Sequence, residues 1–440
     1  MLTAVAIGAA CSLIAVLLHR VVHGGRVGVT PLAAYYFIWT LMTMLTVWNP
    51  LRFVPVGTRT WDAVIVAAVS LTLGYAIGVL GAPRGEGNVR EAPPKPTRNL
   101  LVALLVGGGL LLLLFMSTLV RLGILIHPGV ALYNLRVSLG QGTTSSVGCY
   151  FFCCFQLAVP VAALLFYSTR RIRYVFIAVI AGVALMLTSG RTNVTISLLW
   201  TAALLALLRN ASSVRRRQSI MLACARSACI LIFALLGNAI GKTYDNSKPF
   251  GRYGSSPPLP VSLVLPAYYL KGTLPTLDQI LKTAGGEDGY RNTARPALQL
   301  ARFAGAPIEV PAKIQISYSI REPFNLSTYL SPLWRDGRYV GLTLGSFLLG
   351  LRAGAAFRWW RMRPSHATLL LTALATVTCL ATALDASYTE LSVWLQVLCI
   401  GLMAKAARAA AKSGTRRRQV LMCAHSLRRA DMQSRPRRTR

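Results

Sequence analysis

The stretch LLVALLVGGGLLLLLFMSTLV, residues 100–120, decides the class of fold. It contains no charged residue, and a helix of about 20 apolar residues is long enough to cross the ~30 Å hydrocarbon layer of a bilayer. The whole chain is apolar as well, with 54% hydrophobic residues and a mean hydropathy of +0.52. The sequence therefore predicts an all-α integral membrane protein.

Further apolar runs accompany this one and raise the prediction to about 11 transmembrane helices, within a range of roughly 10–12. We keep Met1–Leu18 as the first span because it lacks a basic leader and a clear cleavage site. The predicted spans lie near 2–18, 29–49, 62–81, 100–120, 147–168, 174–190, 194–208, 219–241, 339–356, 366–384 and 391–406. The predicted organisation is N-terminal transmembrane helices in 1–81, a Pro-rich cytoplasmic linker in 82–99, central transmembrane helices in 100–241, a large extracytoplasmic loop in 242–338, C-terminal transmembrane helices in 339–406 and a basic cytoplasmic tail in 407–440.

The Lys and Arg residues between the spans predict the orientation. With the tail in the cytoplasm, the cytoplasmic segments hold 29 Lys and Arg, against 5 in the short outer segments. The net charge of +34 thus largely reflects topology, and we expect the tail to lie near anionic lipid rather than to bind nucleic acid. The long outer loop is also basic, which insertion does not require and an anionic ligand would explain.

That outer loop contains YYLKGTLPTLDQILK, residues 268–282. Its apolar residues fall on one helical face, so it predicts an amphipathic helix that lies on the membrane or roofs a cavity; a solvated loop is the alternative. The loop has no cysteine, so no disulfide framework is expected there. Cys149, Cys153 and Cys154 lie at helical spacing without a His or acid, which favours packing over a metal site.

Charged residues at the outer ends of the spans are the candidate functional residues. Arg191 in LTSGRTNV and Arg136 in YNLRVSLG are interfacial arginines or anion clamps, because a guanidinium group can bind phosphate oxygens in a bidentate manner. The segment before the span at 339–356 is either a salt-bridged surface cluster or a site in which a carboxylate orients or deprotonates a sugar hydroxyl. Its charged residues are Arg321, Glu322, Arg335, Asp336 and Arg338.

The residues inside the predicted spans disfavour proton-coupled transport. No Asp or Glu lies in the middle of a span, which argues against a proton-coupled transporter or pump, since these need an intramembrane carboxylate relay. Arg226 is a basic residue placed within a span, where it snorkels or lines a cavity.

The order of three blocks resembles the Wzy-type polymerases of oligosaccharide repeat units, the O-antigen and capsular polysaccharide polymerase family. These blocks are SGR before an apolar helix, YLKGTLPTLD, and NLSTYLSPLWRDGRYVGLTLGSFLLG, within roughly 120–350. The last block keeps the family's Asn, Thr, Pro, Asp and Gly pattern but has Gly337-Arg338 where the family has Phe-Gly. The matching residues are Asn325, Thr328, Pro332, Asp336, Gly341, Gly345 and Gly350.

The resemblance implies a GT-C-like, metal-independent membrane glycosyltransferase without a cofactor, in the bacterial cytoplasmic membrane. It would polymerise undecaprenyl-diphosphate-linked repeat units at the outer face. Its partners would be the lipid-linked oligosaccharide, membrane lipids, and a flippase and a chain-length regulator of the same pathway. Asp336, Arg335 and Arg338 would be catalytic, and the diphosphate and sugars would be bound by Arg191, Arg136, Arg321, Glu322, Asn325 and Lys271.

Two other functions stay open. An O-antigen ligase would transfer a finished glycan, but ligases place a functional His in the large outer loop, and none of the five histidines falls in 242–338. A flippase for lipid-linked oligosaccharide would need a cationic cavity and no catalytic residues. A purely structural membrane component is a third reading, which the charged outer junction disfavours.

Overall fold

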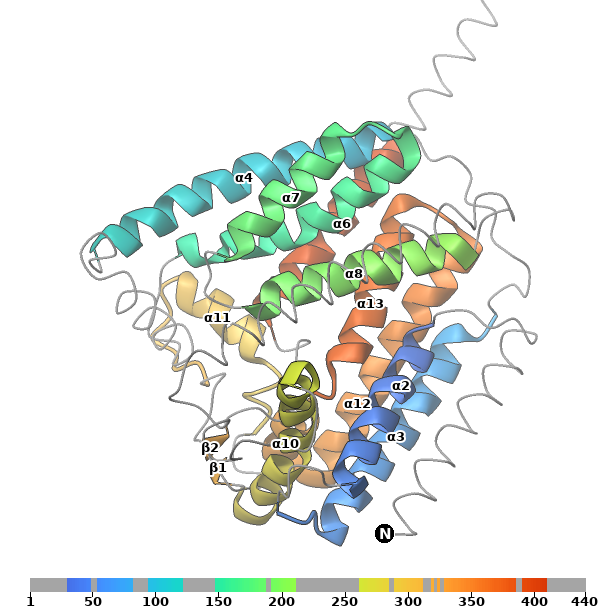
Figure 1. The fold of residues 1–440 in the computed structure, drawn as a ribbon, viewed down its shortest axis with the longest axis vertical. Helices are drawn as coiled ribbons and strands as arrows, with labels where there is room; N and C mark the ends of the chain where they lie inside the picture. Colours follow the sequence, from blue (N-terminus) through green and yellow to red (C-terminus); the bar gives the residue numbers. More distant parts are fainter. Residues whose placement is uncertain are drawn as a thin grey trace, which may run out of the picture.

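The described part of the chain is a bundle of helices (Figure 1). A computed structural model describes residues 30–48, 54–81, 94–121, 147–186, 191–210, 261–284, 289–311, 318–319, 323–324, 328–384 and 390–409. In chain order the elements are α2 (Pro31–Trp48), α3 (Thr58–Val79), α4 (Pro94–Arg121), the 3₁₀ helix η1 (Val147–Tyr150), α6 (Phe151–Thr169), α7 (Arg173–Met186), α8 (Arg191–Asn210), α10 (Val261–Thr283), α11 (Arg295–Phe303), β1 (Tyr318–Ser319), β2 (Pro323–Phe324), α12 (Leu330–Met362), α13 (His366–Ala381) and a last helix over Leu391–Ala409.

Six of the described helices are long and apolar enough to cross a membrane. They are α2, α3, α4, α6, α12 and the last helix, while shorter apolar helices cover Arg173–Leu185, Asn193–Leu208 and His366–Ala381. Each predicted span on described residues coincides with one of these helices. The predicted spans at 2–18 and 219–241 lie outside the described residues. The fold is that of an all-α, multi-pass membrane protein.

Helices α3 and α12 pack backbone to backbone through two pairs of glycines. Gly74 and Gly78 of α3 face α12, and Gly350 and Gly354 of α12 face α3. A β-carbon at any of these positions would overlap the main chain of the opposite helix. Each helix thus carries glycines four residues apart, the spacing by which membrane helices approach most closely.

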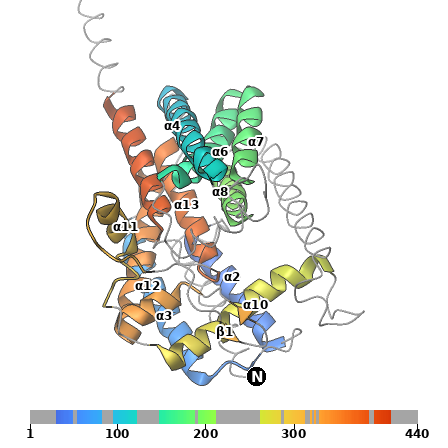
Figure 2. The ribbon, with the colours of Figure 1, turned by 90° about the vertical axis from the view of Figure 1, so that its left-hand side faces the viewer.

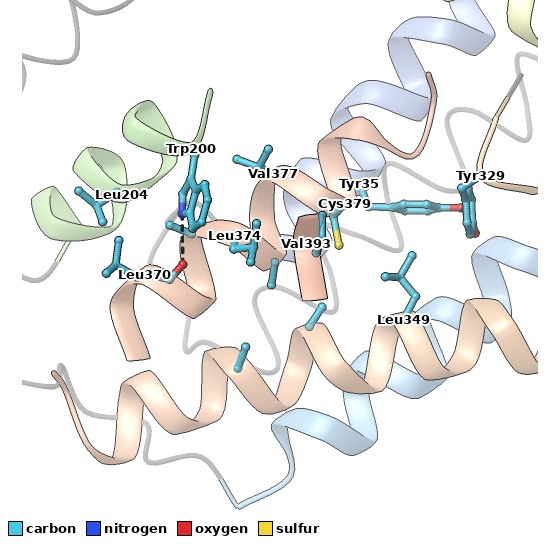
Figure 3. Packing of buried hydrophobic residues seen from close by; sticks show 14 of the residues in the cluster. Tyr35, Trp200, Leu204, Tyr329, Leu349, Leu370, Leu374, Val377, Cys379 and Val393 are labelled. Atoms are coloured by element: carbon cyan, nitrogen blue, oxygen red, sulfur yellow. Dashed lines mark hydrogen bonds between the residues drawn. The ribbon is translucent and has the colours of Figure 1, made fainter. Parts of the chain in front are cut away.

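The centre of the bundle combines apolar packing with a few satisfied polar groups (Figure 3). The buried indole of Trp200 in α8 donates to the carbonyl of Leu370 in α13 over 3.2 Å. Gln396 of the last helix donates to the side-chain oxygen of Gln156 in α6 over 2.8 Å. Paired amides of this kind avoid the cost of an unsatisfied polar group in an apolar interior.

Contacts at the helix ends agree with alternate crossing of the membrane. Asp278 and Gly57, both in segments predicted to lie outside, are hydrogen-bonded over 3.0 Å. At the other end, Thr97 of the predicted cytoplasmic linker is hydrogen-bonded to Nδ1 of His366 over 2.7 Å. Which end faces outward stays a prediction from the charge count.

Much of the predicted outer loop is ordered helix. Helix α10 confirms the amphipathic helix expected at 268–282, and the residues of its apolar face are all buried: Leu274, Leu277, Ile280 and Leu281. The face packs on the bundle, where the Thr273 hydroxyl contacts the sulfur of Met42 at 3.2 Å, so the expectation that it rests on lipid is wrong. Figure 2, turned by 90° from Figure 1, shows α10 crossing the bundle at the end where α3 begins.

Candidate functional site at the break in helix α12

Helix α12 is interrupted near its start, at the residues that the sequence singled out. Gly337 (φ −166°, ψ 25°) and Arg338 (φ 49°, ψ −131°) leave the helical conformation. The positive φ of Arg338 is one that glycine adopts readily and other residues adopt at a cost of about 1–3 kcal/mol. We call this pair the helix break; it separates a short helical segment, residues 330–336, from the long part of α12.

Glycines after the helix break let the short segment lie against the long one. A β-carbon at Gly341 would overlap the carbonyl oxygen of Leu333, and one at Gly345 would overlap the Leu333 side chain. Leu333 is buried in this contact. The glycine spacing read from the sequence therefore serves close packing at the helix break.

Asp336, the last residue of the short segment, is buried and accepts three hydrogen bonds. Its Oδ1 accepts from the backbone N–H of Asn292 over 3.0 Å and from the Asn292 side chain over 2.8 Å. Its Oδ2 accepts from the backbone N–H of Thr293 over 2.7 Å. A carboxylate bonded to backbone amides makes strong, charge-assisted bonds, so Asp336 fixes the turn at residues 289–294 against the helix break.

That turn contains a second residue with positive φ. Tyr290 has φ 69°, and a β-carbon on Gly337 would lie 3.7 Å from the Tyr290 hydroxyl. Among the described residues, the non-glycine positions with positive φ are Arg170, Tyr290 and Arg338. Arg170 is an ordinary left-handed cap at the end of α6, whereas the other two meet at the helix break. Strained backbone gathers preferentially at functional sites, which supports a functional role for this place.

The short segment also joins α3 and α10 through Trp334. The buried Trp334 donates its indole N–H to the carbonyl of Ala284, just after α10, over 2.6 Å. The guanidinium of Arg59, at the start of α3, lies 5.0 Å from the centre of the indole ring. Cation–π contacts of this kind prefer Trp, and here the contact holds a cation at the end of the bundle. Tyr339 packs edge-on against the same ring.

A second buried carboxylate, Asp278 of α10, ties α10 to the start of α3. It accepts from the backbone N–H of Gly57 over 3.0 Å and from the Thr60 hydroxyl over 2.7 Å, and it forms an ion pair with Lys282. Burial alone would raise the pKa of Asp278, but the hydrogen bonds from Lys282, Thr60 and Gly57 outweigh it and lower the pKa below its ordinary value. Asp278 therefore stays ionised and caps α3.

At the end of the bundle that holds the helix break, the described surface residues are more positive than the buried ones. Both central carboxylates, Asp278 and Asp336, are buried and bonded. The exposed cations on the same described segments are Arg59, Lys282, Arg291, Arg302 and Arg338, and the exposed acids are Asp62 and Glu309. An anionic ligand would meet guanidinium groups with exposed Tyr290 and Tyr339 beside them. Among the described residues no group of His, Cys, Asp or Glu could hold a metal ion.

The structure brings together some of the predicted site residues. Arg335 is half-buried on the short segment, beside buried Asp336 and exposed Arg338. Lys271 is buried within α10, away from the surface that a ligand would reach. Arg191 is the first residue of α8, and the structure describes its backbone but not its side chain. Arg136, Arg321, Glu322 and Asn325 lie outside the described residues.

Several residues of this site carried no local signal in the sequence. Arg59, Asn292 and Trp334 join segments that are far apart in the chain, so only the fold reveals their contacts. Glu390 was missed for the same reason: its carboxylate lies 3.4 Å from the guanidinium of buried Arg295. The Asp-Gly pairs at 288–289 and 336–337 are typical turn signals, and they could have indicated the turn at 289–294 and the helix break.

Comparisons with known proteins do not identify the chain: no protein family, no curated protein and no solved structure matches it. Any function must therefore be argued from the residues of the site.

Proposed function

We propose that the chain is a membrane glycosyltransferase that polymerises lipid-diphosphate-linked oligosaccharide repeat units at the outer face of a bacterial cytoplasmic membrane. The proposal combines the resemblance of 325–350 to Wzy-type polymerases with the site at the helix break. The full count of 11 spans, the GT-C-like arrangement and the partners of that pathway belong to the same proposal.

The observation that carries the proposal is the coincidence of strain and positive charge at the membrane end of α12. Tyr290 and Arg338 both have a positive φ; Arg338 follows Gly337 in the chain, and the Tyr290 hydroxyl would lie 3.7 Å from a β-carbon on Gly337. Arg338 and Arg59 are exposed at the same end of α12 and α3, which supports a role for them in binding the diphosphate of a lipid-linked substrate. Cations in fixed positions stabilise the charge that develops on a diphosphate leaving group without a metal ion.

In this proposal the arginines are the catalytic residues. Arg338 and Arg335 stabilise the leaving diphosphate, and Arg191, with Arg136, binds it. A guanidinium suits this task because its planar fork can contact two phosphate oxygens at once. Growth of the polymer then requires a sugar hydroxyl of the incoming unit to attack the anomeric carbon of the growing glycan. The bond from that carbon to the lipid diphosphate breaks, and the hydroxyl proton passes to the departing diphosphate or to water.

Asp336 acts by positioning rather than as a base. Its three hydrogen bonds come from amide donors of the 289–294 turn, and its side chain is buried. A general base must reach the proton that it removes, within about 3 Å or through one water. The positioning role keeps Tyr290 and Arg291 beside the helix break.

The proposal is tested by giving purified protein in nanodiscs a lipid-diphosphate-linked repeat unit and separating the products by size. A ladder of lengths supports a polymerase. A single transfer onto a different acceptor would indicate a ligase, and translocation without new glycosidic bonds would indicate a flippase; either result would overturn the proposal.

Three Arg→Lys variants refine this assay. Arg338→Lys and Arg191→Lys keep the charge but lose the planar fork, so both should slow polymerisation about a hundredfold, equal to roughly 3 kcal/mol. Arg358→Lys is the control, because half-buried Arg358 lies near the opposite end of α12. Full activity of the Arg191→Lys variant would exclude bidentate binding by that residue.

The orientation needs its own test, since lipid-linked repeats are polymerised outside. A reporter inserted at exposed Gly289 should lie outside the cytoplasm, and one after Ala409 should lie inside. A cytoplasmic reporter at Gly289 would remove the basis for the proposal.

A further inference from the structure

Helix α11 is a nine-residue helix, RPALQLARF, whose two ends have different surroundings. Its first residue, Arg295, is buried; Nε donates to the carbonyl of Pro311 over 3.0 Å, and Nη1 contacts Oε1 of Glu390 at 3.4 Å. The turn just before it is held by Asp336 through Asn292. The start of α11 is thus fixed to the bundle at two points.

The rest of α11 exposes an apolar stripe. Ala297, Leu300 and Ala304 are exposed at helical spacing, and Phe303 is exposed beside them. Leu300 is 49% exposed and Phe303 is 40% exposed. Full burial of such a side chain is worth about 1.5–3 kcal/mol, so water is a poor environment for this stripe.

The stripe adjoins the end of a membrane span. The ring of Phe303 packs edge-on against Tyr150 at 5.5 Å, and Tyr150 stacks on Phe152 at 6.0 Å. Phe152 is in the first turn of α6, a candidate span. Figure 1 shows α11 near the end of α6 at which these aromatic residues lie. Aromatic residues gather at this depth in membrane proteins, where hydrocarbon meets the lipid headgroups.

We propose that α11 is an interfacial helix bound to the lipid leaflet at this end of the bundle. The Leu300–Phe303 stripe enters the boundary between acyl chains and headgroups, and exposed Arg302 lies among the lipid phosphates. The occupant is the bilayer because the stripe continues the end of a span. A second copy of the chain fits poorly, since a face of one nine-residue helix is far smaller than the roughly 800 Å² per partner of a stable interface.

This contact has a consequence for the candidate site, although it stands independently of the proposed reaction. Asp336 fixes the turn at 289–294, and that turn leads directly into α11. Lipid contact by α11 therefore sets the depth of Tyr290 and the helix break at the headgroup layer. The phosphate of any membrane lipid, with or without a glycan, lies at that depth.

Photo-crosslinking in the full-length protein tests the proposal. The photoreactive residue p-benzoylphenylalanine replaces Leu300 in one protein and exposed Glu309 in a matched control, in nanodiscs of phosphatidylcholine and phosphatidylglycerol. After irradiation, mass spectrometry of the peptide that contains the probe should show phospholipid adducts at position 300, several-fold above position 309. Phe303 is the second probe position, in case the first substitution prevents folding.

The outcomes separate the possible occupants. Adducts with a second copy of the chain at 300 and 303, or equal lipid labelling at 300 and 309, would overturn the proposal. So would the absence of lipid adducts from proteins that elute as folded species. Arg302→Glu should reduce the share of adducts formed with anionic phosphatidylglycerol; an unchanged share would remove the role assigned to Arg302.

Discussion

Substitution of Asp336 separates its possible roles, because the structure specifies what each variant loses. In Asp336→Asn, the remaining oxygen can serve the buried Asn292 donors, while the new amide faces the half-buried N–H of Thr293. One donor loses its acceptor, at a cost of about 1 kcal/mol. In Asp336→Ala three donors lose their acceptor, two of them on buried Asn292, and the cost rises to about 3 kcal/mol or more.

The assay pairs thermal unfolding in detergent with polymerisation of a lipid-linked repeat unit in nanodiscs. We expect the Asn variant to unfold at a slightly lower temperature than the native protein and to retain much of its activity. The Ala variant should lose both stability and activity. Asp62→Asn is the control, because Asp62 is exposed on α3, and it should change neither quantity. An Asn variant with native stability and substrate affinity but no turnover would refute the positioning role and identify Asp336 as the base.

Three further predictions concern the same end of the chain and its support. Gly350→Leu should destabilise the protein by more than about 3 kcal/mol in thermal unfolding, because its side chain would overlap the α3 backbone, whereas Gly107→Leu, with open space around it, should not; equal effects would contradict the packing. Arg338→Gly should be about 1 kcal/mol more stable than Arg338→Ala, since both lose the guanidinium but only glycine relieves the positive φ; equal stability of the two would mean that this backbone is unstrained. Asp278→Asn should destabilise the protein at neutral pH and match it at low pH. The lowered pKa of Asp278 makes its contribution present above the unfolded pKa and lost as pH falls below about 4, and a gap that persists in acid would show that ionisation is not its source.

The class of fold could be predicted from the sequence because membrane insertion depends on local composition. The run at 100–120 became α4, and the other predicted runs that fall on described residues became helices at the expected places. Helix α10 was also predictable, since its apolar residues repeat with helical period. What α10 packs against was not, because an apolar face fits lipid and protein equally well, and only the folded chain shows that this face is buried against the bundle.

The sequence marks as a candidate site the same residues at which the structure has the helix break, but it does not reveal the contacts made there. A charged run next to a glycine-spaced helix marked residues 335–338, and the structure adds the helix break at that place. The partners of Asp336 were expected to be its arginine neighbours, yet the observed donors come from Asn292 and Thr293. Neighbours in sequence point in different directions around a helical turn, so the closest charges in the chain are not the closest in space. The predicted roles of Arg191, Arg136 and Arg321 stay predictions.

The paired glycines of α3 and α12 have a consequence for how the protein is made. Helix α3 enters the membrane early in synthesis, and its partner surface on α12, residues 350–354, follows only after most of the other helices have been added. Until then the glycine face of α3, around Gly74 and Gly78, lacks the α12 backbone that it contacts in the folded protein. Only α13 and the last helix follow the helix that carries the break, so the site is assembled late in biogenesis, and a chain cut short before residue 350 would leave α3 without its partner.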